Sequence, residues 1–368
     1  MDSGDPPPDL LLLFASSAYG ESFTQLVQTA RERTGAASLI GCSVSGFLAG
    51  GEEIEDRPGL SLMALWLPGA TLHPLRLHQE HIEFLDDPAI WHELYPIPED
   101  EVRSWLVLAE PYRIDVQAML TGLQQRYPAA TIMGGQASGM IEDRKSCVFF
   151  DSQWFEEGAV AIGIGGPYSI RPVVSQGCEP IGESWTITEV DRNSVVTISN
   201  RPAIDILQQT VLALPAGKRQ QAQNNLVIGL AVNEYRDSFE RGDFVMRGML
   251  GLDRTRGSIA VGGLPRVGQT LQFQLRDSAT ADLDLREALT RFGNPGGDAV
   301  AAFLCTCDGR GAALFGTRNH DSELVLDAMG TVPLVGGFFL GEIGPLGDRA
   351  VLQGFTATIG LLQRDPQS

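Results

Sequence analysis

Lysine is almost absent from this sequence. The 368 residues include Lys145 and Lys218 as the only lysines, and 27 basic residues face 46 acidic ones, which gives a formal net charge of −19. A protein that neutralises the phosphates of duplex nucleic acid, or that binds an anionic membrane surface, needs the opposite balance. Neither lysine lies in the Gly-Lys-Ser/Thr sequence of a phosphate-binding loop. We therefore expect neither nucleic acid nor membrane among the partners.

Cysteine is also scarce, and its five copies are an odd number that cannot all pair with one another. Cysteines spread so sparsely along a long chain are unlike a disulfide framework and indicate a reducing compartment. No basic residue precedes Arg31, whereas a secretory signal begins with a positive segment. The apolar run 10–15 is much shorter than the ~20 residues that span a bilayer. These features predict a soluble, cytoplasmic protein.

Hydrophobic residues, at 43% against 20% charged residues, are plentiful enough for a sizeable core. An apolar strand, a helical stretch, a second strand and then glycine recur three times along the chain. The predicted strand, helix and strand occupy 10–14, 21–33 and 38–40, then 105–109, 115–126 and 131–133, and finally 300–304, 322–329 and 333–335. The pattern predicts a mixed α/β (α+β) fold, in which sheets packed with helices are built from duplicated β-α-β-turn-β units.

The composition changes between the second and third repeats. Residues 226–276 alternate in hydropathy with glycine-rich breaks, which predicts strands only, in an antiparallel meander. A helix is expected at 202–214, followed by a polar linker at 215–225 that has almost no large apolar groups. A chain of this length suggests more than one domain, and we place the boundary near residue 176. The expected domains are therefore 1–176 and 177–368.

Glycine follows the second apolar strand of each repeat. Glycine there permits positive φ, or the close approach of another backbone or a ligand. Successive N–H groups in such a turn can surround an anion such as a carboxylate. The alternative is that the glycines only turn the chain between packed layers. The glycines are Gly41, Gly134, Gly135, Gly336 and Gly337.

A nucleophile could follow the first of these glycines. The run 41–46 is close to the Gly-x-Ser-x-Gly elbow of hydrolases, but Ser45 stands where the last glycine should be. A serine triad also needs a partnered histidine and acid, and the chain has only five histidines. A cysteine beside a buried strand is usually a small apolar side chain. An enzyme that uses Cys42, Ser43 or Cys307 stays an alternative, and no catalytic residue is assigned.

Candidate metal ligands are few. Cys305 and Cys307 put two sulfurs on one face of a strand, but four-coordinate zinc needs two more ligands and the sequence has no second cysteine pair of this kind. The acidic run 52–56 lacks the spaced oxygens and the glycine of a calcium loop, and we expect it to be a solvated loop. No metal site is predicted. A haem held by one histidine leaves no sequence pattern, so haem stays open as a cofactor.

The strongest candidate site is C-terminal. Arg310 lies between two glycines after the first strand of the third repeat, and its planar guanidinium can bind a carboxylate through two N–H groups. Glu342 follows that repeat's glycines among aromatic and aliphatic residues, where a lone buried carboxylate is costly. We predict a contact between Arg310 and Glu342 and a shared pocket beneath the glycines. Such a pair is either a structural ion pair or a binding site for the carboxylate or ammonium group of a ligand.

These segments carry a resemblance to a known family. The runs 39–46 and 58–64, with the acidic stretch between them, resemble the N-terminal FIST domain. The run 303–311, which contains Cys-x-Gly-Arg-Gly, and the run 333–345, which contains Gly-Glu-Ile-Gly, resemble the C-terminal FIST domain. Domains 1–176 and 177–368 are therefore expected to be FIST N-like and FIST C-like. Gln353 stands where a histidine often precedes Gly-Phe-Thr in the family.

FIST domains are described as small-ligand-binding sensory modules in signalling proteins of bacteria, archaea and eukaryotes. The resemblance implies a non-enzymatic sensor that binds amino acids or other small carboxylates in intracellular signal transduction. A haem-binding gas or redox sensor, an enzyme with a cysteine or serine nucleophile, and a pure interaction scaffold are the alternatives. Nine residues precede the first predicted strand, so we expect no F-box there and a separate signalling protein as the output partner. The candidate ligand-binding residues are Arg310, Glu342, Gly41, Cys42, Ser43, Gly134, Gly135, Cys307, Gly336 and Gly337.

Overall fold

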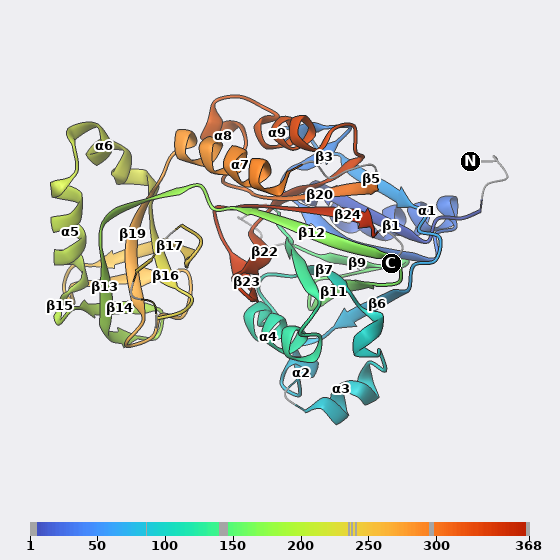
Figure 1. Cartoon of the computed structure of the whole chain (residues 1–368), viewed down its shortest axis with the longest axis horizontal. Coiled ribbons are helices and arrows are strands. Elements are labelled where there is room, and N and C mark those ends of the chain that lie inside the picture. Colours follow the sequence, from blue (N-terminus) through green and yellow to red (C-terminus); the bar gives the residue numbers. More distant parts are fainter. Residues whose placement is uncertain are drawn as a thin grey trace. The chain divides into compact units, whose positions relative to one another are not determined.

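The structure is a computed structural model of the chain (Figure 1), and it describes residues 6–85, 87–139, 146–234, 236, 238–239, 241–293 and 298–365. Sheets packed with helices make up the mixed α/β fold that the sequence predicts. The chain forms two compact units. Unit 1 comprises Met1–Val174, Ala288–Leu352 and Thr356–Ser368, and unit 2 comprises Ser175–Glu287 and Gln353–Phe355.

Unit 1 is built from the three predicted repeats, each with two parallel strands joined through helices. The first contains β1 (Leu10–Ser16), η1 (Ser17–Ser22), α1 (Phe23–Thr34) and β2 (Ser38–Val44). The second contains β7 (Ser104–Ala109), α4 (Val116–Arg126) and β8 (Thr131–Gln136). The third contains β20 (Ala299–Cys307), α8 (Ala312–Phe315), α9 (His320–Met329) and β21 (Leu334–Phe339). The strand-helix-strand predictions are confirmed, and the third repeat joins the first two although unit 2 precedes it in the chain.

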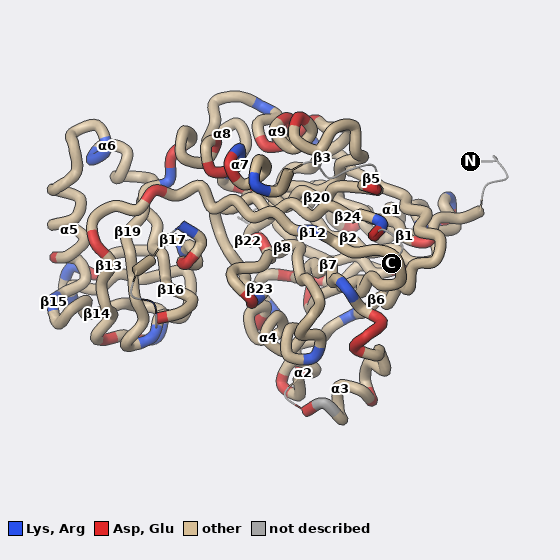
Figure 2. Tube along the Cα trace, viewed as in Figure 1, with Lys and Arg blue, Asp and Glu red and all other residues tan. Residues whose placement is uncertain are grey.

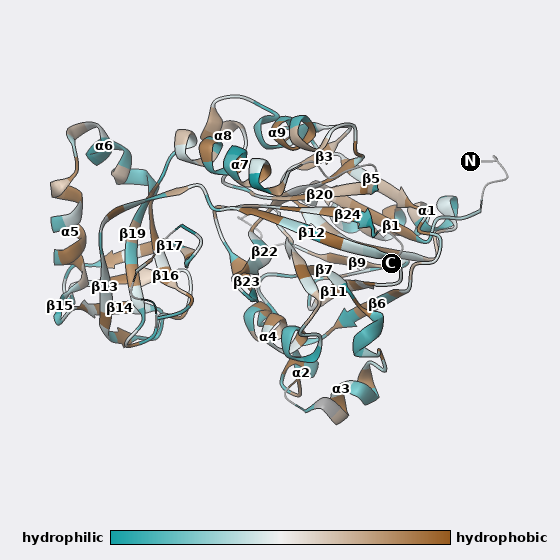
Figure 3. Cartoon of the chain, viewed as in Figure 1, coloured by the Kyte–Doolittle hydropathy of each residue, from teal (hydrophilic) through white to brown (hydrophobic). Residues whose placement is uncertain are grey.

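Each repeat also supplies a return strand that runs antiparallel beside its first strand. The return strands are β5 (Leu60–Leu65) on β1, β11 (Ala159–Ile164) on β7, and β24 (Ala357–Arg364) on β20. Every repeat therefore provides three adjacent strands of one sheet. Figure 3 shows that these strands are largely apolar, and their side chains form the core of unit 1.

The hairpin between the second strand and the return strand leaves its own sheet and joins another, an arrangement that we call the cyclic strand exchange. The hairpin β3 (Phe47–Ala49) and β4 (Glu52–Ile54) of the first repeat pairs with β21 of the third. The hairpin β22 (Gly341–Leu346) and β23 (Arg349–Gln353) of the third repeat pairs with β8 of the second. The hairpin β9 (Val148–Phe150) and β10 (Gln153–Phe155) of the second repeat pairs with β2 of the first.

Two of the three sheets carry one further strand beside the return strand. From the end of the first repeat, β6 (Leu72–Leu77) runs antiparallel to β11 of the second. From the end of the second repeat, β12 (Tyr168–Ser175) pairs with β24 of the third. The sheet of the first repeat, in contrast, has the order β10-β9-β2-β1-β5 and ends at β5. Three short helices connect β6 to β7, namely α2 (Gln79–Ile82), α3 (Pro88–Leu94) and η2 (Glu99–Glu101).

The glycines that we expected to form turns lie inside strands instead. A Cβ atom at the first glycine of each repeat would stand 1.8 to 1.9 Å from the carbonyl oxygen of the residue opposite it on the first strand. The close approach of a neighbouring backbone therefore explains why these residues are glycine. Gly134 and Gly336 also have positive φ angles, which favour glycine further. The pairs are Gly41 with Leu13, Gly134 with Val107, and Gly336 with Leu304, while Gly135 and Gly337 are the next, equally buried strand residues.

Unit 2 contains a seven-stranded sheet with the order β13-β19-β16-β17-β18-β14-β15. The strands expected within 226–276 are confirmed, but β19 pairs with β16 instead of β18, so the strands are not neighbours in chain order. The strands are β13 (Cys178–Asp191), β14 (Ser194–Ile198), β15 (Arg201–Pro202), β16 (Leu226–Ala231), β17 (Phe244–Asp253), β18 (Ser258–Val261) and β19 (Thr270–Arg276).

The helices of unit 2 include one that the sequence analysis missed. The predicted helix at 202–214 is confirmed as α5 (Ala203–Ala213). The predicted linker at 215–225 is wrong, because α6 (Ala216–Asn225) occupies it. Its alanine, glutamine, lysine and arginine residues favour a helix although few of them are apolar. The chain then continues through α7 (Ser278–Phe292), which leads into the third repeat.

The surface chemistry agrees with the composition. Acidic residues occur along the chain in both units and outnumber the basic ones (Figure 2). All five cysteines are buried, and none forms a disulfide bond. Among the helices that the structure describes, none combines the length and the apolar character needed to cross a bilayer.

Candidate functional site

Arg310 is fully buried in unit 1, three residues after the end of β20. Its Nε and Nη2 atoms donate to Oδ2 and Oδ1 of Asp321, at 2.7 and 2.8 Å. The predicted contact between Arg310 and Glu342 is therefore wrong, because the ion pair forms with Asp321. A helix that follows a parallel strand starts near the carboxyl end of that strand, and this brings the second residue of α9 to the guanidinium.

The Asp321 carboxylate is surrounded by donors. Thr306 Oγ1 donates to Oδ2 at 2.7 Å, and His320 Nδ1 donates to Oδ1 at 2.9 Å. Burial alone would raise the pKa of this carboxyl group, but the charge and hydrogen bonds of Arg310 hold the pKa well below its usual range. The Phe315 ring covers the cluster, with its centroid 3.4 Å from that of His320 and 5.2 Å from the guanidinium carbon. Asp321 is thus ionised and fully engaged.

Glu342, on β22, is also fully buried. Its Oε2 atom accepts hydrogen bonds from the backbone N–H and the hydroxyl group of Thr356, at 3.1 and 2.7 Å. Burial raises the pKa of Glu342 to about 8, because an apolar environment disfavours the charged form. At neutral pH this carboxyl group therefore carries a proton in most molecules.

Three buried polar atoms of this region have no hydrogen-bond partner within the part of the chain that the structure describes: Arg310 Nη1, Glu342 Oε1 and Thr358 Oγ1. Thr358 follows Thr356 by two positions in extended chain, so both side chains lie on the same face. The charge of Glu342 raises the pKa of Arg310, and the charge of Arg310 lowers that of Glu342. An unsatisfied buried polar group costs about 1–3 kcal/mol. These atoms are therefore candidates for pairing with a small polar molecule.

A comparison of the repeats shows that the fold can form without the polar pair Glu342 and Thr356. The sheet registers place Phe47 of the first repeat and Val148 of the second where the third has Glu342. Gly59 likewise occupies the place of Thr356, since its carbonyl accepts the equivalent backbone hydrogen bond. A Cβ atom at Gly59 would stand 2.2 Å from the Phe47 ring, so this apolar residue fills the same space as the carboxyl group. Because apolar residues satisfy the same architecture, the fold does not require Glu342, which favours a binding role.

The predicted nucleophiles differ in their surroundings. Ser43 Oγ donates to the Ser138 carbonyl at 2.9 Å and accepts from the Cys147 N–H at 3.0 Å, so this hydroxyl group holds the backbone together. Burial raises the pKa of Cys42 well above its ordinary value and disfavours the reactive thiolate. Cys307 is buried beside Arg310, where its charged form would raise the arginine pKa, so it belongs to the Arg310 cluster.

The acidic run 52–56 is not the solvated loop that we expected. Glu53, on β4, is buried, and its Oε1 atom accepts from the Ser322 N–H in the first turn of α9 at 2.8 Å. Glu55 Oε1 accepts from the Ala312 N–H at the start of α8 at 2.9 Å. Burial, and then the charge of Asp321, raise the pKa of Glu53 to about 7. Carboxylates favour helix N-termini, but the sequence does not reveal that these acids cap helices of another repeat.

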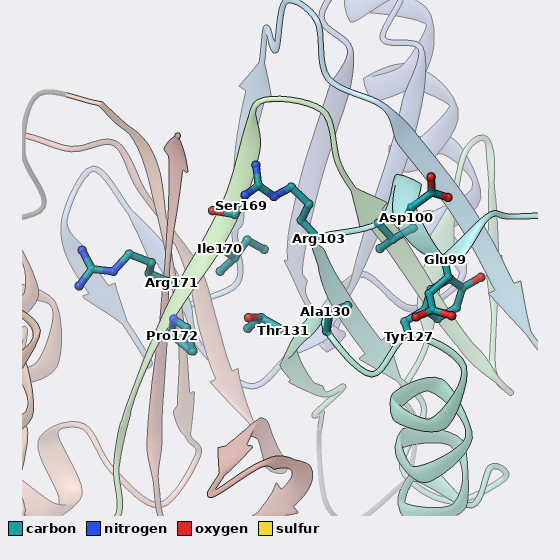
Figure 4. Close-up of a pocket in the computed structure, with 12 residues that line it drawn as sticks. Glu99, Asp100, Arg103, Tyr127, Ala130, Thr131, Ser169, Ile170, Arg171 and Pro172 are labelled. Atoms are coloured by element: carbon teal, nitrogen blue, oxygen red, sulfur yellow. The ribbon is translucent and has the colours of Figure 1, made fainter. Parts of the chain in front are cut away.

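An open pocket of about 830 Å³ lies elsewhere on unit 1 (Figure 4). Figure 4 shows Arg103 and Arg171 on one side of it and Glu99 and Asp100 on the other. Arg103 forms an ion pair with Asp365 at 2.6 Å. None of the ten predicted ligand-binding residues lines this pocket, so it is distinct from the Arg310 cluster.

A metal ion or a haem needs side chains that can donate electron pairs to the metal. The described residues contain no group of three or more histidine, cysteine, aspartate and glutamate side chains that could hold a metal ion. The pocket of Figure 4 is lined by no histidine, cysteine or methionine, and Tyr127 is the one lining residue of a type that ligates haem iron. His320, beside the candidate site, uses one ring nitrogen to hold Asp321. Haem therefore stays a prediction for which these residues define no site.

Repeats that exchange strands around a buried polar cluster define an α/β protein of modular, repeat-based construction. Domain models identify the modules: the FIST N domain matches residues 9–201 and the FIST C domain matches residues 203–345. The chain therefore belongs to the FIST family, and the resemblance seen in the sequence is confirmed. FIST domains are generally sensory domains of signal transduction.

Similar proteins occur in mycobacteria. An uncharacterized protein of Mycobacterium tuberculosis (strain H37Rv) is 33% identical over 360 residues, which cover 96% of this chain and 91% of the relative. An uncharacterized protein of Mycobacterium bovis is 32% identical and covers 97% of this chain and 91% of its own length. The solved structure of cyanuric acid hydrolase from A. caulinodans matches 81% of this chain and 100% of its own at 9% identity, with a TM-score of 0.21, and carries no argument.

Proposed function

We propose that this chain is a non-enzymatic sensory protein that binds a small carboxylate-bearing molecule, such as an amino acid, at Arg310 and Glu342. The observation that carries the proposal is that Arg310 Nη1 and Glu342 Oε1 are both buried without a hydrogen-bond partner in the described residues, while the charge of Arg310 acts on the pKa of Glu342. A guanidinium N–H group suits a ligand carboxylate. A carboxyl oxygen that can ionise suits a ligand ammonium group.

Both side chains are held in place before any ligand arrives. Asp321 fixes the guanidinium of Arg310 through two hydrogen bonds, which leaves the direction of Nη1 defined. Thr356 fixes the carboxyl group of Glu342 in the same way through Oε2. Preorganised groups lose little conformational entropy on binding, so more of the interaction free energy appears as affinity. The arrangement therefore supports a specific site for a small ligand.

Thermal denaturation of the full chain in the presence of separate candidate ligands tests the proposal. The panel contains the standard amino acids and small mono- and dicarboxylates, and a separate arm with haem is read by the Soret band. A ligand at 100 times its dissociation constant stabilises the native state by about 2.7 kcal/mol. We expect a raised midpoint with at least one α-amino acid or small carboxylate.

Glu342→Gln is the informative variant, because the amide oxygen still accepts from Thr356 while the group can no longer ionise. We expect at least tenfold weaker binding of the stabilising ligand and an unchanged circular dichroism spectrum. Glu93→Gln, at an exposed position of α3, is the matched control and should bind as the unsubstituted chain does. If no ligand stabilises the chain, or if Glu342→Gln binds normally, the proposal is wrong.

A further inference from the structure

The sheet of the first repeat has no strand where the other two sheets have one. In those sheets the return strands β11 and β24 each have a further neighbour, β6 and β12. The equivalent return strand β5 pairs with β1 on one side, and no strand in the described part of the chain pairs with its other side. The architecture of the repeats thus offers a strand position that stays open at β5.

The backbone hydrogen bonds show which groups of β5 face this open side. The carbonyl groups of Gly59 and Leu65 accept from the first repeat's own backbone, at Ser16 and Asp9, both at 2.9 Å. Main-chain groups alternate in direction along an antiparallel strand. The N–H and C=O groups of the even-numbered residues, with Leu62 in the middle, therefore point away from β1 and toward the open side.

The composition of β5 does nothing to protect this edge. Soluble proteins usually guard an edge strand with charged residues, proline or a bulge. The strand Leu60–Leu65 contains neither a charged residue nor proline. Leu62 is 40% exposed, and Trp66, directly after the strand, is 43% exposed. These are the properties of a strand that pairs with another strand.

We infer that β5 pairs with β5 of a second copy of this chain, which gives the sheet of each first repeat its missing strand. Two copies of one strand related by a two-fold axis run antiparallel. This is the direction in which β6 lies on β11 at the equivalent position. Like charges opposite one another would oppose such self-pairing, and β5 carries none. The inference is independent of the proposed ligand and of the Arg310 site.

Sedimentation velocity of the full chain over a range of concentrations tests the inference. We expect a dimer for the unsubstituted chain and a monomer for Leu62→Lys, because a charge on the edge disfavours strand pairing. Leu283→Lys, which changes another exposed leucine, on α7 in unit 2, is the control and should remain a dimer. Circular dichroism verifies that each variant is folded.

A cross-linking experiment adds a positive readout. Because the native cysteines are all buried, Leu62→Cys introduces an exposed thiol near the expected two-fold axis. Oxidation with diamide should convert this variant to a disulfide-linked dimer, whereas Leu283→Cys should stay monomeric on a non-reducing gel. A monomer at every concentration, or a dimer that persists in Leu62→Lys, overturns the inference.

Discussion

The guanidinium of Arg310 and the carboxylate of Asp321 form a two-pronged ion pair, and neither side chain is more than 1% exposed. The aspartate also accepts hydrogen bonds from Thr306 and His320, so its oxygens are occupied. The charge of the arginine is thereby balanced inside the protein while one of its nitrogens stays available. The pair holds the candidate site in place, and we expect its removal to lower the stability of unit 1 as a whole.

Asp321→Asn should destabilise the protein by about 3–5 kcal/mol, because it leaves the Arg310 charge buried without a counter-charge. Urea denaturation followed by circular dichroism measures this free energy of unfolding. Asp191→Asn is the matched control, since it removes the same type of partner from Arg256 at the surface of unit 2. The control should leave stability almost unchanged. Equal effects of the two substitutions would mean that the buried pair has no special role.

Stability should fall as the pH rises toward 8, and Glu342 should be one cause. The pKa of this residue is about 8 in the folded protein, against an ordinary value of 4.5 for an exposed glutamate. Between these values the folded state holds a proton that the unfolded state has lost, so the contribution of Glu342 to stability decreases with rising pH. Free energies of unfolding measured from about pH 5 to pH 8 should therefore decline less steeply in Glu342→Gln. Identical slopes would contradict the raised pKa.

Binding of an ammonium-bearing ligand at pH 7 should release a proton. With a pKa of about 8, roughly nine in ten Glu342 carboxyl groups are protonated at that pH. An ammonium group beside Oε1 favours the ionised form. Calorimetric titrations of the same ligand in buffers with different ionisation enthalpies measure the released protons directly. We expect a value near one for the unsubstituted chain and near zero for Glu342→Gln.

Gly336→Ala should cost about 3 kcal/mol or more, because it combines overpacking with backbone strain. The added Cβ would stand 1.9 Å from the Leu304 carbonyl oxygen, at a φ of +152°. Gly217→Ala, in α6, is the control: no atom lies within 4 Å of its Cβ position, and alanine favours a helix. Chemical denaturation should show a large loss of stability for the first variant and a small gain for the second.

Much of the fold follows from local sequence patterns. Apolar strands and amphipathic helices such as 21–33 identify the β-α-β units, because each buries an apolar face with its own period. The exchange of hairpins between sheets does not follow, since a short strand such as β22 carries no signal that names its partner. The segment 215–225 was predicted to be a linker because it has almost no large apolar residues. Its residues favour a helix, but without an apolar face the helix cannot be recognised from periodicity.

The burial of Arg310 and Glu342 could be predicted from the sequence, but their contacts could not. The glycine context of Arg310 and the apolar context of Glu342 identify two costly buried groups, and both are fully buried. Their partners, Asp321 and Thr356, are set by the place where α9 begins and by the register of β24, and neither is visible in a single sequence. The glycines were assigned to turns because a strand glycine that accommodates a neighbouring carbonyl looks the same in the sequence.

The cyclic strand exchange has a consequence for synthesis of the protein on the ribosome. The sheet of the second repeat needs β22, and β3 needs the sheet of the third, yet residues 175–287, the main part of unit 2, emerge before either of those partners does. The nascent chain therefore exposes incomplete apolar sheets, which are prone to aggregation, for as long as residues 175–287 take to be translated. Cotranslational protection by a chaperone should matter more for this polypeptide than for one whose repeats close by themselves.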